Sequence, residues 1–140
     1  MAVNEVAASL LYQVMAVAGQ VIGRMQEGLE RLDLTGPTAN LLWILNPDAE
    51  PPPLRKLAAL LHCDPSNVTL LSAKLEERGL AERRPHPRDG RVRTLVLTPE
   101  GRKTREQLLG IVAKRSPFAD LDAEEQRHLQ SLLGKALAGR

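Results

Sequence analysis

Apolar residues near the start of the chain recur at steps of four and three residues, the period of one face of an α-helix. The stripe begins at Val3, passes through Val21 and reaches Leu32 with a small drift in phase. It predicts a helix from about residue 4 to 31, roughly 40 Å long at 1.5 Å per residue. We expect part of this stripe to pack on another chain. The alternative is a long helix folded entirely onto its own domain.

Two shorter helical patterns follow this stripe. Gly36 and Pro37 break the chain before a helix predicted over residues 38–45, with three leucines facing inward: Leu41, Leu42 and Leu45. Residues 46–53 include the run Pro51, Pro52 and Pro53, which predicts a loop. Apolar spacing from Leu54 to Leu61 then predicts a third helix that ends near Cys63.

A fourth helix has clear start and stop signals. Asp64 stands at the N-cap position, Pro65 at the first helical position, and Gly79 follows the end. Its buried stripe is Val68, Leu71 and Leu75. The opposite face carries small, polar or basic residues and one leucine: Ser66, Asn67, Thr69, Leu70, Ala73 and Lys74. Two short helices joined by residues 62–64 are typical of a helix-turn-helix.

A β-hairpin is predicted next, with strands at residues 80–84 and 92–98. We expect the segment 85–91 between them to be too long for a two-residue turn and to be tipped with Asp89 and Gly90. Five arginines decorate the hairpin: Arg83, Arg84, Arg88, Arg91 and Arg93. A purely structural hairpin would rarely need so many charges of one sign.

Two capped helices complete the chain. Thr98 and Pro99 predict a helix that runs to about Lys114. Asp122 with Glu125 forms a capping-box pattern at the start of the last helix. The inner stripe of that helix is expected to be Leu129, Leu132, Leu133, Ala136 and Leu137.

Charge distribution adds a functional indication. The 140 residues carry 19 basic and 17 acidic side chains, but residues 54–105 alone have a net charge of +6 and the rest of the chain −4. A polyanionic partner is the first inference, and a solvated charged face is the alternative. The three aromatic residues, Tyr12, Trp43 and Phe118, are too few for single-strand modules that stack bases. The length suits one domain with a core of leucine, valine and alanine.

Other functional classes find little support. His62, His86 and His128 are isolated, and the sequence has neither an HExxH motif nor a glycine-rich phosphate loop, so we expect no catalysis, metal or cofactor. Cys63 is the only cysteine, and we interpret it as a packed apolar residue instead of an oxidation sensor. The residues before Ala18 lack a basic leader, and no 18-residue run is uninterrupted by polar residues. The expected location is the cytoplasm, with no membrane partner.

Several motifs together resemble the multiple-antibiotic-resistance regulator (MarR) family of bacterial transcription factors. They are DPSNVT at 64–69, LEERGLAER at 75–83, DGR at 89–91 and LVLTPEGR at 95–102. The flanking helices agree in order and length, so the resemblance covers nearly the whole chain. It implies a mainly α fold with a small β-hairpin, a winged helix-turn-helix with long N- and C-terminal dimerisation helices. Residues 1–140 would form a single MarR-type domain, with dimerisation helices at 1–34 and 106–140 and a DNA-binding lobe at 36–105.

The resemblance also implies DNA-binding residues. In the family, the fourth helix enters the major groove and the hairpin, or wing, reaches the minor groove. The residues that match are Ser66, Asn67, Thr69, Leu70, Lys74, Arg88, Arg91 and Arg93. Asp89 is expected to support the wing by bonding its backbone or orienting Arg91. Leu70 departs from the family pattern, because arginine or glycine is frequent there.

Two functions from different classes remain at this stage. The first is a homodimeric, ligand-responsive repressor that binds pseudo-palindromic double-stranded DNA and whose small-molecule effector fits between the dimer helices and the lobe. The second is a winged-helix module that docks on proteins without specific DNA binding. The arginine-rich hairpin favours the first, because a protein-docking lobe would more often expose an apolar patch.

Overall fold

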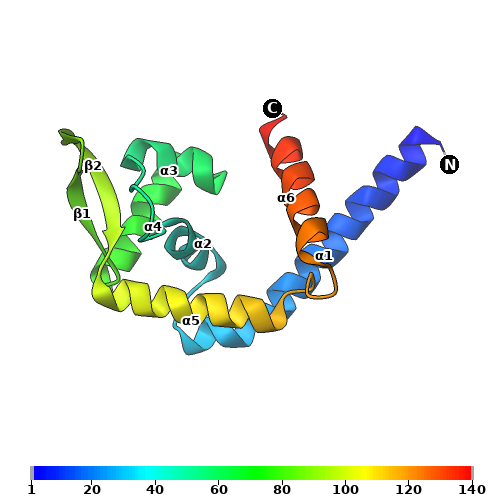
Figure 1. Ribbon diagram of the computed structural model, residues 1–140, viewed down its shortest axis with the longest axis horizontal. Coiled ribbons are helices and arrows are strands. Elements are labelled where there is room, and N and C mark those ends of the chain that lie inside the picture. The colour runs from blue at the N-terminus through cyan, green and yellow to red at the C-terminus, as the bar shows by residue number, and fades with distance from the viewer. Residues whose placement is uncertain (1, 140) are drawn as a thin grey trace. The chain divides into compact units, whose positions relative to one another are not determined.

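The computed structural model describes residues 2–139 (Figure 1). Within these residues, four helices precede one antiparallel hairpin and two helices follow it, in the predicted order. The elements are α1 (Val3–Arg31), α2 (Gly36–Ile44), α3 (Leu54–Leu61), α4 (Pro65–Glu77), β1 (Ala81–His86), β2 (Asp89–Leu97), α5 (Pro99–Arg115) and α6 (Ala123–Ala138). The predicted fold class, mainly α with one small hairpin, is confirmed.

The chain divides into two compact units. One contains α1 up to Met25 together with the chain from Val112 through α6, and the other is Gln26–Ile111. We call the second unit the lobe. The boundaries between the two units lie at residues 25/26 and 111/112 of the chain, whereas the sequence predicted boundaries near residues 34 and 106. The last turns of α1 belong to the lobe because Gly28 packs directly on α5: a Cβ there would lie 2.7 Å from Cγ2 of Ile111.

Leucine side chains form the centre of the lobe. The most deeply buried come from α2, α3, α4 and β2: Leu41, Leu42, Leu57, Leu75 and Leu95. Each of these elements contributes one apolar face, so the core fixes α4 against α2 and α3 as the predicted helix-turn-helix requires. Leu45, which the sequence also placed inward, is buried at the end of α2.

The start of α2 differs from the prediction. Gly36 and Pro37 lie in its first turn, not before it, because Thr35 caps the helix. The Thr35 hydroxyl accepts a hydrogen bond from the Thr38 backbone N–H at 3.3 Å, and the Thr38 hydroxyl accepts one from the Thr35 N–H at 2.8 Å. Proline suits such a first turn, since the N–H that it lacks would have no helical partner there.

The hairpin is longer and its turn shorter than predicted. Pairing extends outward to His86 and Asp89, so Pro87 and Arg88 form a two-residue turn. Asp89 and Gly90 therefore lie in β2 and not at the tip. The prolines concealed this pairing: Pro85 sits in a two-stranded sheet where every strand is an edge, next to a register shift that absorbs the irregularity.

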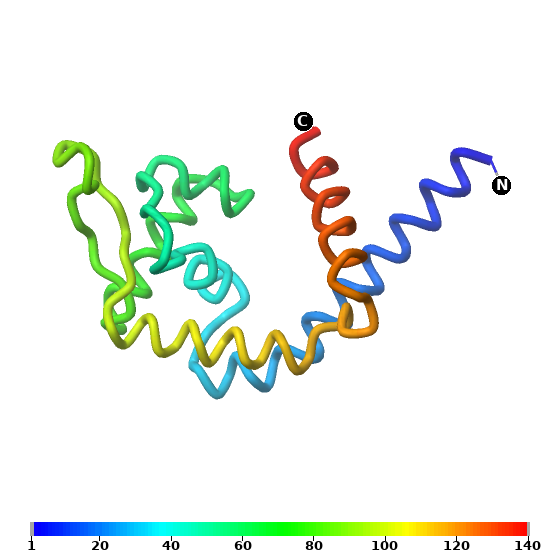
Figure 2. The backbone as a smooth tube through the Cα atoms, in the orientation of Figure 1, coloured from blue at the N-terminus to red at the C-terminus, as the bar shows by residue number. Residues whose placement is uncertain are grey.

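Helix α5 follows directly on β2 at the base of the hairpin, as the trace in Figure 2 shows. The Thr98 hydroxyl accepts a hydrogen bond from the Gly101 N–H at 3.0 Å and donates one to the Gly79 carbonyl. Gly79 has the left-handed φ of +70° expected of a glycine just after α4. Gly101 leaves no room for a side chain, because a Cβ there would lie 1.8 Å from the Leu80 carbonyl oxygen.

The unit formed by most of α1 and by α6 has little core of its own. Apolar side chains exposed on α1 include Leu10, Val14 and Ile22, and no residue of α6 is buried within this chain. The Asp122 and Glu125 capping box forms as predicted, with bonds of 2.8 and 3.0 Å. Two leucines of the inner stripe predicted for α6, Leu132 and Leu133, are exposed to solvent. Both helices present apolar surface that this single chain leaves uncovered.

Helix α1 also changes one expectation about membranes. It contains an 18-residue window with a mean hydropathy of 1.6, so its length and composition alone would allow it to cross a bilayer. The polar residues that interrupt its apolar runs are therefore not enough to exclude a membrane span.

We predict that Gly101→Ala destabilises the lobe by more than about 2 kcal/mol, because the new methyl group meets backbone that cannot move aside. Gly110→Ala in the same helix is the matched control. Nothing lies within 4 Å of a Cβ at position 110, so Gly110→Ala should raise the free energy of unfolding by about 0.5 to 1 kcal/mol through its higher helix propensity. Urea unfolding of the two variants tests this, and equal stability of both would contradict the assigned contact.

Candidate nucleic-acid interface

Helix α4 separates a buried face from an exposed one. Val68, Leu71 and Leu75 are buried, as predicted. The residues predicted to contact DNA are all exposed: Ser66, Asn67, Thr69, Leu70 and Lys74. Because side chains three and four positions apart share a helix face, the core contacts alone decide which residues point outward. The outward face is a 13-residue helix surface with hydrogen-bonding groups near its N-terminus.

The start of α4 is open to an anion. Asp64 occupies the N-cap position as predicted, but its side chain makes no capping hydrogen bond. The chain enters from His62, which has the left-handed φ of 54° at the end of α3. Backbone N–H groups at a helix N-terminus and the helix dipole favour a phosphate. The Thr69 hydroxyl donates to the Pro65 carbonyl at 3.3 Å, which orients it and leaves its lone pairs free to accept.

The predicted wing residues lie along β2 and the turn. Arg88 stands on the turn, whereas Arg91 and Arg93 lie in β2, and all three are exposed. Arg91 lies within β2 and not in the turn, because the strand begins at Asp89. The Asp89 carboxylate accepts from the Arg91 backbone N–H at 3.1 Å and from its Nε at 3.4 Å. These are the contacts expected of a residue that supports the wing.

Four wing arginines are held by carboxylates through Nε. Arg83 Nε donates to Glu76 at 3.1 Å, Arg84 Nε to Glu82 at 2.7 Å, Arg88 Nε to Glu50 at 2.8 Å, and Arg91 Nε to Asp89. The hydrogen bond from Arg88 lowers the pKa of the Glu50 carboxyl below its ordinary value, and the same contact raises the pKa of Arg88. Arg93 has no ion-pair partner among residues 2–139.

Two basic residues of the positively charged segment 54–105 make contacts within the lobe and stabilise its fold. Arg78, just after α4, donates to the carbonyls of Leu32 and Asp33 beyond the end of α1. Arg105 is buried, with its Nε bonded to the Trp43 carbonyl at 3.0 Å and its guanidinium 4.7 Å from the Trp43 ring centre. Net charge per segment therefore overstates the charge that the lobe offers to a partner.

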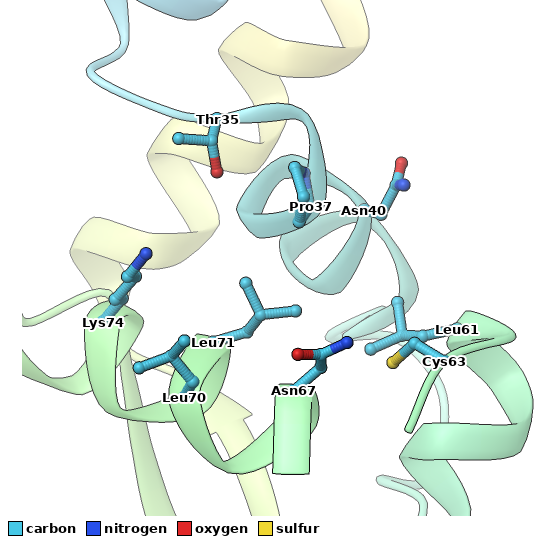
Figure 3. Close-up of a pocket in the computed structure, with 9 residues that line it drawn as sticks. All are labelled: Thr35, Pro37, Asn40, Leu61, Cys63, Asn67, Leu70, Leu71 and Lys74. Atoms are coloured by element: carbon cyan, nitrogen blue, oxygen red, sulfur yellow. The ribbon is translucent and has the colours of Figure 1, made fainter. Parts of the chain in front are cut away.

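A cavity of about 470 Å³ opens beside the exposed face of α4 (Figure 3). Pro37 and Asn40 line it from α2, and Leu61 and Cys63 line it from the end of α3. Its remaining residues are Thr35, Asn67, Leu70, Leu71 and Lys74. Three of them, Asn67, Leu70 and Lys74, are predicted DNA contacts, so the cavity and the candidate interface overlap. Cys63, which the sequence predicted to be a packed apolar residue, is partly exposed here.

The sequence did not identify one residue that contacts the wing, Glu50. Glu50 lies in the loop before α3, and it contacts the wing turn 38 positions later. Nothing in the local sequence signals this contact, because the two segments are joined only by the fold. Within residues 2–139, no three metal-binding side chains gather into one site.

The fold and sequence match known proteins. The MarR family model matches residues 34–92. The HTH-type transcriptional repressor IacR of Pseudomonas putida is 29% identical over 124 residues, which are 87% of this chain and 74% of that protein. The family match includes α2, the helix-turn-helix, β1, the turn and the start of β2.

Solved structures extend the likeness to the flanking helices. CouR from Rhodococcus jostii RHA1, bound to p-coumaroyl-CoA, superposes with a TM-score of 0.79 at 24% identity and covers 94% of this chain and 93% of its own. A MarR variant from E. coli in complex with operator DNA has a TM-score of 0.71 at 25% identity, covering 98% and 99%. Coverage this complete includes α1, so that helix is part of a fold shared with DNA-binding regulators. The fold is that of MarR-type winged helix-turn-helix proteins, and residues 34–92 match the MarR family.

Proposed function

We propose that the protein is a sequence-specific DNA-binding transcriptional repressor that acts as a homodimer on a pseudo-palindromic operator. One observation carries the proposal. The same lobe exposes the polar and basic face of α4 and an arginine-rich wing, while the opposite face of α4 is buried in the leucine core. IacR, the curated relative, is a transcriptional repressor, and the E. coli MarR variant is bound to operator DNA.

In this proposal α4 reads the major groove, which is wide enough to admit an α-helix. Asn67 and Thr69 are short hydrogen-bonding groups that approach base edges, and Ser66 lies in the first turn, where phosphate is favoured. Lys74 reaches a phosphate near the other end of the helix. Leu70 is exposed and apolar, so it suits contact with a thymine methyl group.

The wing supplies the second contact. Arg91 and Arg93 are exposed on β2, and Arg88 is exposed on the turn. Arginine enters narrow A·T-rich minor grooves, where the electrostatic potential is most negative. Asp89 orients Arg91 through its Nε and thereby acts as the wing support. Reading both grooves explains why the wing carries positive charge and little apolar surface.

Dimerisation uses the terminal helices in this proposal. Exposed leucines and valines on α1, and Leu132, Leu133 and Leu137 on α6, are the surface that a second copy covers. A two-fold dimer presents two lobes, so its operator has two inverted half-sites about one helical turn apart. We place the protein in the cytoplasm, where its DNA is, and assign it no enzymatic activity.

We also propose that a small molecule controls DNA binding. CouR is bound to p-coumaroyl-CoA, so this compound is the first probe to add to the protein–operator complex. The cavity beside α4 has a volume within the range of ligand sites, about 300 to 1,000 Å³. A compound held there would meet Asn67, Leu70 and Lys74 and exclude DNA from them.

Selection of bound fragments from random duplex DNA tests the proposal most broadly. We expect an inverted repeat whose affinity falls by about three to five orders of magnitude between 50 and 200 mM salt, as for a protein that displaces six to ten counterions. No preferred duplex, or binding insensitive to salt, would instead favour a winged-helix module that docks on proteins.

Charge placed in the apolar stripes should break the dimer. Leu133→Glu on α6 and Leu10→Glu on α1 should weaken dimerisation by at least about 100-fold, because an unpaired buried charge costs about 3 to 5 kcal/mol. Ser131→Glu, on the other side of α6, is the control and should remain dimeric. Light scattering at micromolar concentration measures the state. A wild-type monomer would remove the basis for a two-fold operator.

Substitutions in α4 and in the wing should differ in kind. Asn67→Ala or Thr69→Ala should lose about 1 to 3 kcal/mol of discrimination between bases in the major groove. Arg91→Ala should lower affinity while fold and dimer stay intact, and the loss should be smaller on sites whose flanking A·T pairs are replaced by G·C. Arg127→Ala is the matched control, because it removes one positive charge from α6, which lies outside the lobe. If Arg91→Ala binds all sites like wild type, the hairpin does not read DNA.

A further inference from the structure

The wing tip is tied to the loop between α2 and α3 by one acidic side chain. Glu50 Oε1 accepts from Arg88 Nε at 2.8 Å and lies 3.1 Å from His86 Nε2, and Oε2 pairs with Arg88 Nη2. His86 Nδ1 accepts the Arg88 backbone N–H at 3.1 Å. A single carboxylate thus contacts the last residue of β1 and the second residue of the turn.

The loop that carries Glu50 is itself stiff and anchored. Pro51, Pro52 and Pro53 follow Glu50 directly, and each proline fixes its own φ. Pro53 forms an isolated antiparallel bridge with Thr94, a fully buried residue of β2. The loop therefore touches the hairpin twice, at Thr94 through the backbone and at the turn through Glu50. The proline run gives Glu50 a rigid support.

The contact leaves part of Arg88 free. A guanidinium has five N–H donors, and Glu50 engages Nε and Nη2 only. The Arg88 side chain remains 78% exposed, so Nη1 is available to a second anion. An exposed ion pair of this kind contributes little to folding stability. Its effect is therefore expected in binding, where a fixed guanidinium loses less conformational entropy than a mobile one.

We propose that Glu50 is a positioning residue for DNA recognition: it fixes Arg88 and the wing turn for selective minor-groove contact and offsets one positive charge that would otherwise bind any phosphate. This inference rests on the proposed function. It predicts opposite changes when the carboxylate is removed. Affinity for arbitrary DNA rises because a repelling charge is gone, whereas selectivity falls because Arg88 is no longer held.

The first test needs no DNA. In the full-length protein, the NMR order parameter of the Arg88 Nε–H group should fall below about 0.6 in Glu50→Ala, the range of flexible groups. Asp48→Ala is the matched control: it removes the same charge from the same exposed loop, and the Asp48 side chain makes no hydrogen bond or ion pair with the wing residues 81–97. Arg88 should stay ordered in that variant.

The second test uses the selected operator, a copy with G·C flanks and an unrelated duplex. In Glu50→Ala, the preference for the operator over the G·C-flanked copy should fall about fivefold or more, the lower end of what one lost base-pair discrimination costs. The salt slope should steepen by about 0.9 per subunit. Asp48→Ala should keep the wild-type preference.

An ordered Arg88 in Glu50→Ala, or an unchanged preference, overturns the assignment to Glu50. The same loss of preference in Asp48→Ala also overturns it, because loop charge alone would then explain the effect. If wild type prefers no duplex, the proposed function fails, and the order parameter of Arg88 still reports separately whether the contact with Glu50 positions it.

Discussion

Packing of α4 on the leucine core is the interaction on which the rest of the structure depends. Leu75 is inaccessible to solvent, Val68 and Leu71 complete the buried face, and α4 packs against α2, α3 and β1. Burying three such side chains contributes about 1.5 to 3 kcal/mol each. Once that face is inside, the helical period leaves Asn67, Leu70 and Lys74 outside. The core thereby orients the reading face without any contact from the reading residues themselves.

Polar contacts then fix the neighbours of α4 around it. Arg78 joins the end of α4 to the carbonyls that follow α1, and Arg105 joins α5 to the end of α2. The close approach of Gly101 to Leu80 seats α5 at the base of the wing. Glu50 holds the wing at its far end. Of the charged residues in the lobe, some therefore maintain its shape and others remain exposed for a polyanion.

The sequence predicted the parts of this fold that depend on local chemistry. Helical periods, the Asp122 and Glu125 capping box and the glycine after α4 are set by residues close in the chain, and they appear where predicted. The wing turn was misjudged because Pro85 and Pro87 resemble loop residues, whereas an edge strand with a register shift accepts Pro85.

Contacts between distant segments were beyond local reasoning. Neither the pairing of Glu50 with Arg88 nor the structural role of Arg78 has a sequence spacing that would reveal it. The sequence located the exposed residues of α4 and the wing arginines, because periodicity and charge identify surfaces. It did not show which arginines are already paired within the protein, since that depends on which segments the core brings together.

Chemical interference on the selected operator tests the central claim, that one lobe reads the major groove with α4 and the minor groove with the wing. Methylation of guanine N7 marks the major groove and methylation of adenine N3 the minor groove. The account predicts that N7 methylation interferes within two inverted half-sites and that N3 methylation interferes in the A·T pairs flanking each. Interference in one groove only, or in a single unrepeated site, would contradict it.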